Sequence, residues 1–158
     1  LAVLLKNGDK YQLALSGDGP EKSSLIELSK ELDVSDCVVF PGWLDKETLL
    51  NSMKNADILV IPRWRPELTS MIALESMALG VPVIVTRNTA LSWQMQESAM
   101  TFVDEDYNEL AMQIKKLRDE PKLRVELIKK GWNRLRELDI NTIFPKLMNA
   151  ISHLTGSS

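Results

Sequence analysis

Short apolar runs alternate with amphipathic stretches along most of the chain. Apolar runs bounded by Gly, Pro or Asn predict strands at 11–16, 37–40, 57–61, 81–85 and 100–103. Apolar residues at helical spacing predict helices at 21–32, 45–53, 70–79, 90–97, 106–118, 121–137 and 142–154, with 1–6 as the end of another. Short apolar strands separated by single helices are typical of a parallel sheet that is covered on both faces. The pattern therefore predicts one α/β domain built on a doubly wound parallel sheet.

Length and composition narrow the classes of protein. The 158 residues are enough to bury the core of one domain. The net charge of −3 does not favour nucleic acid, and no apolar run is long enough to cross a membrane. One cysteine excludes an internal disulfide, and one histidine excludes a catalytic histidine pair or a histidine-rich metal site. Leu1 stands in what looks like the last turn of a helix, so we expect a fragment of a longer protein.

Residues 63–86 carry the strongest chemical signal. Within them the segment MIALESMAL, residues 71–79, holds one charged residue, Glu75. A second carboxylate, Glu67, stands eight positions earlier, in a loop behind Pro66. A carboxylate inside an apolar helix is costly to bury unless it is paired or hydrogen-bonded. Glu75 therefore has either a protein partner or a ligand.

The start of the same helix is suited to an anion. Thr69 or Ser70 can cap it, and the free amide groups of its first turn form an anion site together with the helix dipole. In doubly wound sheets, ligands bind beyond the carboxyl ends of the strands. The loops at 17–20, 41–44 and 62–70 take that place here. The arrangement suits a ligand with hydroxyl groups at both ends and a phosphate in the middle.

A purely structural interpretation of the two carboxylates stays open. Glu67 can pair with Arg63 or Arg65, and Glu75 can pair with Arg87 across the end of the helix. Either pairing would offset part of the cost of the charge without any ligand.

The spacing of Glu67 and Glu75, followed by MALGVPVIVT, resembles the donor-binding signature of retaining GT-B glycosyltransferases. These are glycosyltransferase family 4 and its relatives, also known as glycosyl transferases group 1. Three landmarks of that family precede the signature in the right order, namely SGDGP at 16–20, VVFPGWLDKETLL at 38–50 and NADILVIP at 55–62. The resemblance extends over residues 11–116.

The resemblance implies a role for each matching residue. Glu75 would accept hydrogen bonds from the ribose hydroxyls of a nucleotide-sugar donor. Glu67 would be the catalytic residue that faces the transferred sugar. The remaining donor-binding positions are the amides of Thr69 and Ser70 for the sugar, those of Met71 and Ile72 for the diphosphate, and the main chain of Gly42 and Trp43, with Gly17 nearby, for the base. A packed loop aromatic stays open as the alternative for Trp43.

The resemblance also implies the identity of the whole domain. Residues 1–158 would be the C-terminal, Rossmann-like, nucleotide-sugar-binding domain, without its first strand and without the N-terminal acceptor domain. The implied reaction is retaining transfer of a sugar from a nucleoside-diphosphate sugar to an acceptor hydroxyl, with no cofactor and no metal. A saccharide or lipid-linked acceptor would bind the N-terminal domain. We expect a cytoplasmic enzyme of polysaccharide or glycolipid biosynthesis, and peripheral contact with the inner face of the membrane stays open.

Two departures from the family pattern keep alternatives open. A Gly-aromatic-Gly triplet is usual after the first glutamate, whereas this chain has Leu68, Thr69 and Ser70, which predicts a reshaped sugar pocket. The family's Arg and Lys, five apart, follow the first strand of the domain, and that strand would precede Leu1. A degenerate, non-catalytic nucleotide-sugar-binding module and a GT-B nucleotide-sugar epimerase are therefore alternatives. A receiver-type signalling domain would need an Asp at the carboxyl end of a strand, and Asp57 opens its strand instead.

Overall fold

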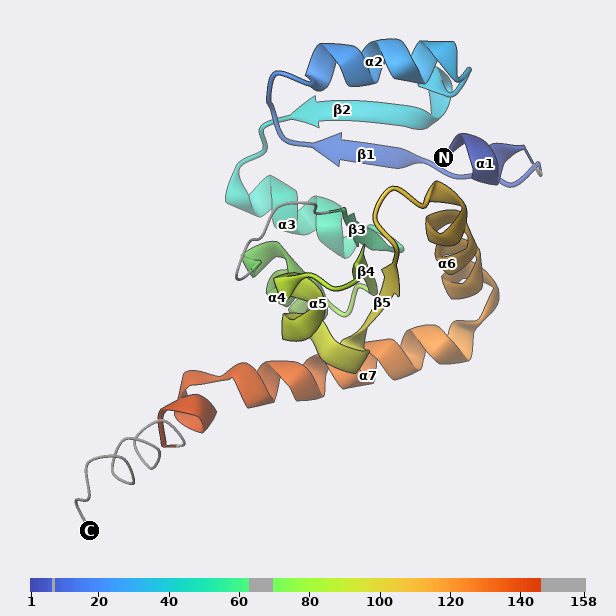
Figure 1. Cartoon of the computed structure of the whole chain (residues 1–158). Helices are drawn as coiled ribbons and strands as arrows, with labels where there is room; N and C mark the ends of the chain where they lie inside the picture. The colour runs from blue at the N-terminus through green and yellow to red at the C-terminus, as the bar shows by residue number, and fades with distance from the viewer. Residues whose placement is uncertain (7, 63–69, 146–158) are drawn as a thin grey trace.

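The computed structural model describes residues 1–6, 8–62 and 70–145 of the chain (Figure 1). The strands are β1 (Leu13–Ser16), β2 (Val38–Gly42), β3 (Leu59–Ile61), β4 (Val83–Thr86) and β5 (Ala99–Phe102). The helices are α1 (Ala2–Leu5), α2 (Lys22–Glu31), α3 (Lys46–Lys54), α4 (Met71–Leu79), α5 (Ala90–Met95), α6 (Tyr107–Asp119) and α7 (Pro121–Leu138). Two 3-10 turns, Ser35–Cys37 and Gln96–Ser98, lead into β2 and β5.

The order of helices and strands agrees with the prediction, and the boundaries differ in places. Strand β2 continues to Gly42 through Pro41. Proline is tolerated there because, among the described strands, β2 pairs only with β1 and is an edge strand. Strand β3 begins at Leu59 and not at Asp57, whose carboxylate accepts a hydrogen bond of 3.3 Å from Arg124 of α7. Residues 140–145 are helical. The rest of the predicted helix 142–154 lies outside the described residues.

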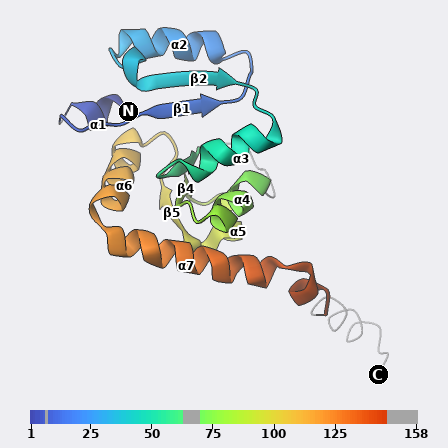
Figure 2. The same cartoon turned by 180° about the vertical axis from the view of Figure 1, so that it is seen from behind.

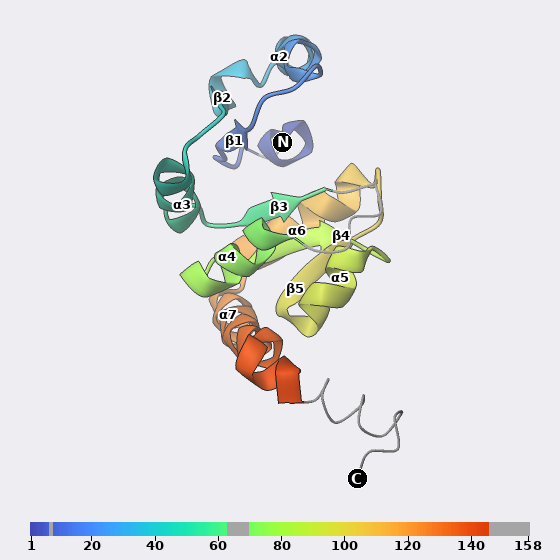
Figure 3. The ribbon, with the colours of Figure 1, turned by 90° about the vertical axis from the view of Figure 1, so that its left-hand side faces the viewer.

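The described strands divide between two parallel sheets. In the first, β1 pairs with β2, and Leu13 stands opposite Val38. In the second, the order is β3-β4-β5, and Val83 stands opposite Leu59 on one side and Ala99 on the other. Figures 1 and 3 show β1 on the side of its sheet that faces β3. Parallel α/β architecture is thus confirmed, while no described strand is hydrogen-bonded to both sheets.

Helices cover both faces of the second sheet. One core lies between the sheet and helices α4 and α5 and contains Ile61, Ala73, Met77, Val83, Val85, Leu91 and Met95. The other lies against α6 and α7 and contains Ile84, Phe102, Leu117 and Leu127. Successive side chains of a strand point to opposite faces, so β4 alternates between the two cores. Figures 1 and 2 show α7 on the side of this sheet that lies away from β1 and β2.

Strand β1 is much less buried than β4. All four residues of β4 are buried, because strands flank it on both sides and helices cover both faces. Along β1, Leu13 and Leu15 are half-buried, and Ala14 and Ser16 are exposed. In β3, which also has one edge without a described strand, two of the three residues are half-buried. Among the described residues, the edges of β1 and β3 that face each other have no strand hydrogen-bonded to them.

A charged cluster connects the chain ahead of β1 to α6. Arg118 donates to Asp9 at 2.7 Å, and its guanidinium lies 5.4 Å from the centre of the Tyr11 ring. Burial raises the pKa of the Tyr11 hydroxyl, and a hydrogen bond from Arg118 lowers the pKa of Asp119. Helix α1 also contacts α6. These contacts fix the start of β1 against the second part of the fold.

Candidate nucleotide-binding site

Helix α4 is fixed along one face and at its C-terminus. Gly80 ends it in the left-handed conformation, with φ 71° and ψ 30°. In this turn the amide of Val81 donates to the Ser76 carbonyl at 2.9 Å, and that of Gly80 donates to the Met77 carbonyl at 3.1 Å. Ala73, Ser76 and Met77 are buried against the core. The helix is therefore held at its C-terminal end by this turn and along its length by its buried face.

Glu75 of this helix pairs with Lys46 of α3. The ammonium of Lys46 donates to Oε1 of Glu75, and α3 lies against α4. The Lys46 side chain is 62% exposed and the Glu75 side chain only 18%. Oε2 of Glu75 is buried and has no hydrogen-bond partner within the described part of the chain. The alternative pairing of Glu75 with Arg87 is wrong, because the carboxylate lies beside a different helix.

Asp45 places Lys46 at the start of α3. Asp45 is the N-cap, and its carboxylate accepts hydrogen bonds from the amide of Thr48 at 3.0 Å and from the Thr48 hydroxyl at 2.7 Å. The hydrogen bond from the Thr48 amide lowers the pKa of Asp45. Lys46 is consequently the first residue of α3, and its side chain starts from a fixed point of the backbone.

The first two predicted loops meet next to this pair. The amide of Gly17 donates to the carbonyl of Gly42 at 2.8 Å, so the ends of β1 and β2 lie together. Both glycines have positive φ, 127° at Gly17 and 76° at Gly42, which residues with a Cβ rarely adopt. Trp43 follows with 84% of its surface exposed. The alternative of a packed loop aromatic is therefore wrong, and the indole is available at the carboxyl edge.

The N-terminal end of α4 faces outward. Ser70 has the extended backbone of an N-cap, but its side chain makes no cap hydrogen bond, and its amide donates to Oε1 of Gln94 at 3.0 Å. Met71 and Ile72 follow with exposed side chains. The amides of a first helical turn have no acceptor inside their own helix, so those of Met71 and Ile72 are suited to a ligand.

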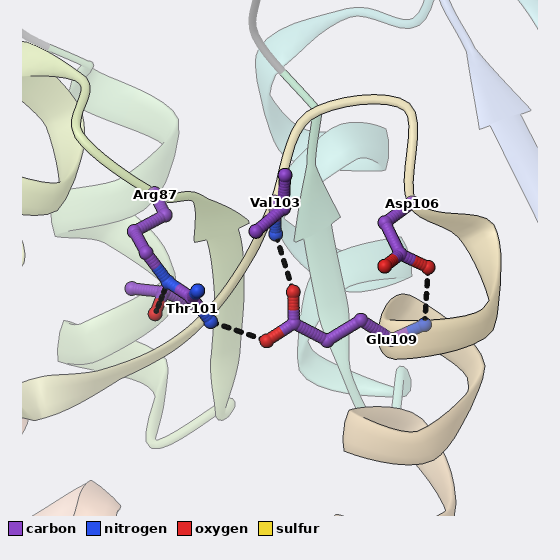
Figure 4. Close-up of polar contacts among 5 residues, drawn as sticks. All are labelled: Arg87, Thr101, Val103, Asp106 and Glu109. Atoms are coloured by element: carbon purple, nitrogen blue, oxygen red, sulfur yellow. Dashed lines mark hydrogen bonds and ion pairs between the residues drawn. The ribbon is translucent and has the colours of Figure 1, made fainter.

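Arg87 belongs to a different cluster, after β4 and β5 (Figure 4). Its guanidinium pairs with Oε1 of Glu109, and its Nε donates to the hydroxyl of Thr101 at 3.4 Å. The other carboxylate oxygen of Glu109 accepts from the amide of Val103 at 2.6 Å, and the Glu109 amide donates to Asp106 at 2.8 Å. This cluster secures the start of α6, which accounts for the charge of Arg87 without a ligand.

The structure brings some of the predicted site residues together and does not test others. Gly17, Gly42 and Trp43 lie at the ends of β1 and β2, and Glu75 lies with Lys46 between α3 and α4. Glu67 and Thr69 lie outside the described residues, as do Arg63 and Arg65. The sequence reasoning missed Lys46 and Gln94, whose contacts are with residues 29 and 24 positions away. Pairings between separate helices leave no periodic signal in the sequence.

The described part of the chain lacks two kinds of feature. Across residues 1–6, 8–62 and 70–145, no group of three or more His, Cys, Asp or Glu side chains is placed to hold a metal ion. Among the helices described, none has both the length and the apolar character that a membrane crossing requires.

Comparisons with known proteins agree with the sequence resemblance. The family model described as Glycosyl transferases group 1 matches residues 1–134. The lipopolysaccharide core biosynthesis glycosyltransferase LpsD of Rhizobium meliloti (strain 1021) is 35% identical over 134 residues, which are 84% of this chain and 38% of LpsD. The chain therefore spans less than half the length of this relative.

Two solved structures have a similar fold. Sucrose-phosphate synthase from Thermosynechococcus elongatus superposes with a TM-score of 0.77 at 25% identity, covering 99% of this chain and 42% of the synthase. Anabaena HepE, crystallised in complex with UDP, superposes with a TM-score of 0.78 at 19% identity, covering 97% of this chain and 44% of HepE. Both likenesses extend over almost all of this chain and less than half of the other protein.

Proposed function

This chain belongs to the glycosyl transferases group 1 family, and we propose that it is the donor-binding domain of a retaining glycosyltransferase. The reaction is transfer of a sugar from a nucleoside-diphosphate sugar to an acceptor hydroxyl. The observation that carries the proposal is the carboxylate of Glu75. One of its oxygens is held by Lys46, and the other is buried without a described partner at the carboxyl ends of the strands. A ligand hydroxyl would supply the missing donor.

The rest of the donor fits the neighbouring main chain. The loops of Gly17 and Gly42 lie together beside the exposed Trp43, which offers backbone groups and an aromatic face to a base. The amides of Met71 and Ile72 at the start of α4 suit the diphosphate. Ribose would then lie between them at Glu75. The complex of HepE with UDP supports a nucleoside diphosphate as the ligand.

Retention and the catalytic role of Glu67 are parts of the same proposal. Glu67 would face the hydroxyls of the transferred sugar beside the reaction centre, with the amides of Thr69 and Ser70 next to it. The departing diphosphate would be stabilised by the helix amides, which are fixed before the reaction begins. This proposal rests on the spacing of Glu67 and Glu75 in the sequence.

We also propose that the complete protein holds a further strand and an acceptor domain. The chain spans 38% of LpsD, and among the described residues no strand pairs with the facing edges of β1 and β3. A doubly wound sheet has the strand order 3-2-1-4-5-6. The observed orders β2-β1 and β3-β4-β5 fit it with one strand still to be placed between β1 and β3. The family's Arg and Lys would follow that strand, and the acceptor domain would bind the saccharide or lipid-linked acceptor.

We propose that no metal or other cofactor takes part, and that the enzyme works in the cytoplasm on a polysaccharide or glycolipid. The name of LpsD supports the class of product. Peripheral contact with the inner face of the membrane belongs to the same proposal. An excess of EDTA should leave donor binding and sugar transfer unchanged, and loss of either would contradict metal independence.

A non-catalytic nucleotide-sugar-binding module is the second candidate. The amide of Ser70, proposed to contact the sugar, already donates to Gln94 at 3.0 Å, and Leu68, Thr69 and Ser70 replace the family's glycine-containing triplet. Such a module would bind the nucleoside diphosphate without consuming a nucleotide sugar. Incubation of the complete protein, with its acceptor domain, with nucleotide sugars and an acceptor, followed by analysis for released nucleoside diphosphate, separates the two candidates.

Calorimetric titration with UDP, GDP, ADP and CDP tests the proposed function. We expect one of them to bind, and Glu75→Ala to weaken it by about 1.5–3 kcal/mol, or roughly 10- to 100-fold, because hydrogen bonds to a charged acceptor are lost. Glu27→Ala, on the exposed face of α2, is the matched control and should bind like the wild type. Absence of binding in the wild-type protein, or equal binding by Glu75→Ala, would refute the proposal.

A further inference from the structure

We propose that Lys46 is a positioning residue that holds one oxygen of Glu75 and thereby makes the other oxygen selective for a ribose hydroxyl. The inference rests on the proposed function and adds to it a residue from a second helix. It assigns the distinction between a ribonucleotide and a deoxyribonucleotide to a Lys–Glu pair and not to Glu75 alone.

The first observation is the difference in environment between the two oxygens of Glu75. Oε1 accepts from the ammonium of Lys46, and Oε2 is buried with no hydrogen-bond partner among the described residues. An ionised carboxylate only accepts hydrogen bonds, so Oε2 can be satisfied only by a donor such as a hydroxyl. Leaving a buried acceptor without a donor costs free energy that a ligand with the right hydroxyl recovers.

The second observation is the way in which the pair is held. Glu75 lies in the middle of α4, whose buried face and glycine-capped end fix its backbone. Lys46 is the first residue of α3, where the N-cap Asp45 binds Thr48 through two hydrogen bonds. The Lys46 side chain therefore connects the two helices, and its hydrogen bond to Oε1 orients the carboxylate of Glu75.

The third observation is the position of Lys46 in the site. It follows directly on the loop of Gly42 and Trp43, and its side chain is 62% exposed. The pair thus stands between the groups proposed for the base and the helix end proposed for the diphosphate, where the ribose must lie. A site built to hydrogen-bond a ligand hydroxyl discriminates strongly against the analogue that lacks it, because the polar group of the site is then left unpaired.

The test compares a nucleoside diphosphate with its deoxy forms in four proteins. The probe is whichever of UDP, GDP, ADP and CDP binds tightest, together with its 2′-deoxy and 3′-deoxy analogues. The proteins are the full chain as wild type, Lys46→Met, Lys46→Arg and Lys54→Met. Lys54 is exposed in the last turn of the same helix and provides the matched control. Thermal melting of each protein confirms that it is folded.

We expect the wild type to bind the ribonucleotide at least tenfold more tightly than one of the deoxy analogues. Lys46→Met should lose about tenfold in affinity for the ribonucleotide and little for that analogue, so that the ratio falls by about tenfold. Lys46→Arg should restore the ratio, because a guanidinium also donates to a carboxylate. Lys54→Met should behave like the wild type. A purely structural role of Lys46 would not change this ratio in a folded protein.

A double-mutant cycle shows whether Lys46 acts through Glu75. In the Glu75→Ala background, Lys46→Met should cause no further loss of affinity, because the residue that it orients is gone. An unchanged ratio in Lys46→Met would overturn the inference. So would equal losses for the ribonucleotide and its deoxy analogues, since these indicate a direct contact of Lys46 with the ligand.

The two proposals fail in different ways. If the wild type binds no nucleoside diphosphate, the proposed function fails and the inference fails with it. If the wild type binds and Glu75→Ala weakens binding, but Lys46→Met keeps both the affinity and the ratio, only the inference fails.

Discussion

Replacement of Gly80 by alanine tests the account of how α4 is held in place. Gly80 lies at the end of α4 with φ 71°, in the left-handed region. Its amide and that of Val81 close the helix by donating to Met77 and Ser76. Alanine in this conformation brings its Cβ close to the carbonyl oxygen that follows, and glycine does not.

The size of the effect follows from two contributions. A Cβ at Gly80 would lie 3.5 Å from a ring carbon of Trp132 and 3.6 Å from a methyl group of Ile128, which are ordinary contacts. No steric clash is therefore added, and the cost is that of the backbone alone, about 1–2 kcal/mol. In a domain of this size such a loss lowers Tm by roughly 2–8 °C.

Urea denaturation and differential scanning calorimetry measure this loss directly. Gly19→Ala is the control, because Gly19 has no positive φ and a Cβ there meets nothing within 4 Å. We expect the control to stay within about 0.5 kcal/mol of the wild type. An equally stable Gly80→Ala protein would refute the argument from the left-handed turn. A loss above about 3 kcal/mol would show that the Cβ clashes after all.

Three further predictions concern separate parts of the fold. Trp43→Ala should keep the free energy of unfolding within about 0.5 kcal/mol of the wild type, because Trp43 is 84% exposed. The same change should weaken nucleoside diphosphate binding, and an unchanged calorimetric affinity would contradict the place of Trp43 in the site. Met95→Ala should lower the free energy of unfolding, measured in urea, by about 2–5 kcal/mol, because Met95 of α5 is fully buried in the core between α4, α5 and the second sheet. A loss below about 1 kcal/mol would contradict that packing. The N-cap of α3 should respond to acid, because the fold lowers the pKa of the Asp45 carboxyl below its ordinary value of 3.8. The stability that the ionised Asp45 contributes is therefore present above pH 3.8 and is lost as the pH falls through the pKa of the folded state. The amide resonance of Thr48 in an NMR titration should report a midpoint below 3.8, and a midpoint above it would exclude the cap.

Much of the fold is predictable because the signals that define it are local. Asp45 is a side chain of the type that caps helices, and it caps α3, which begins one residue after the start of the predicted helix 45–53. Gly80 and the apolar run after it predicted the end of α4 and the buried strand β4. Alternation of short strands with single helices was sufficient to predict parallel strands covered on both faces. These features depend on neighbours within a few positions of the chain.

The partner of Glu75 was not predictable in the same way. Arg87 was the candidate suggested by proximity in sequence, but it pairs with Glu109 in the first turn of α6. Lys46, 29 positions before Glu75, is the partner because α3 packs against α4. A long charged side chain can reach several opposite charges, and the packing of the helices determines which of them it pairs with. Division of the strands between two sheets was likewise hidden, since the strand sequences do not say which edges remain unpaired.

A crystal structure of the protein with a bound nucleoside-diphosphate sugar is the most direct test of the central claim. We predict the ribose with a hydroxyl within about 2.5–3.0 Å of Oε2 of Glu75, and Lys46 still on the other oxygen. The base should lie along the main chain of Gly42 and Trp43, and the diphosphate at the amides of Met71 and Ile72. A nucleotide bound elsewhere, or bound here without contact to Glu75, would contradict the account.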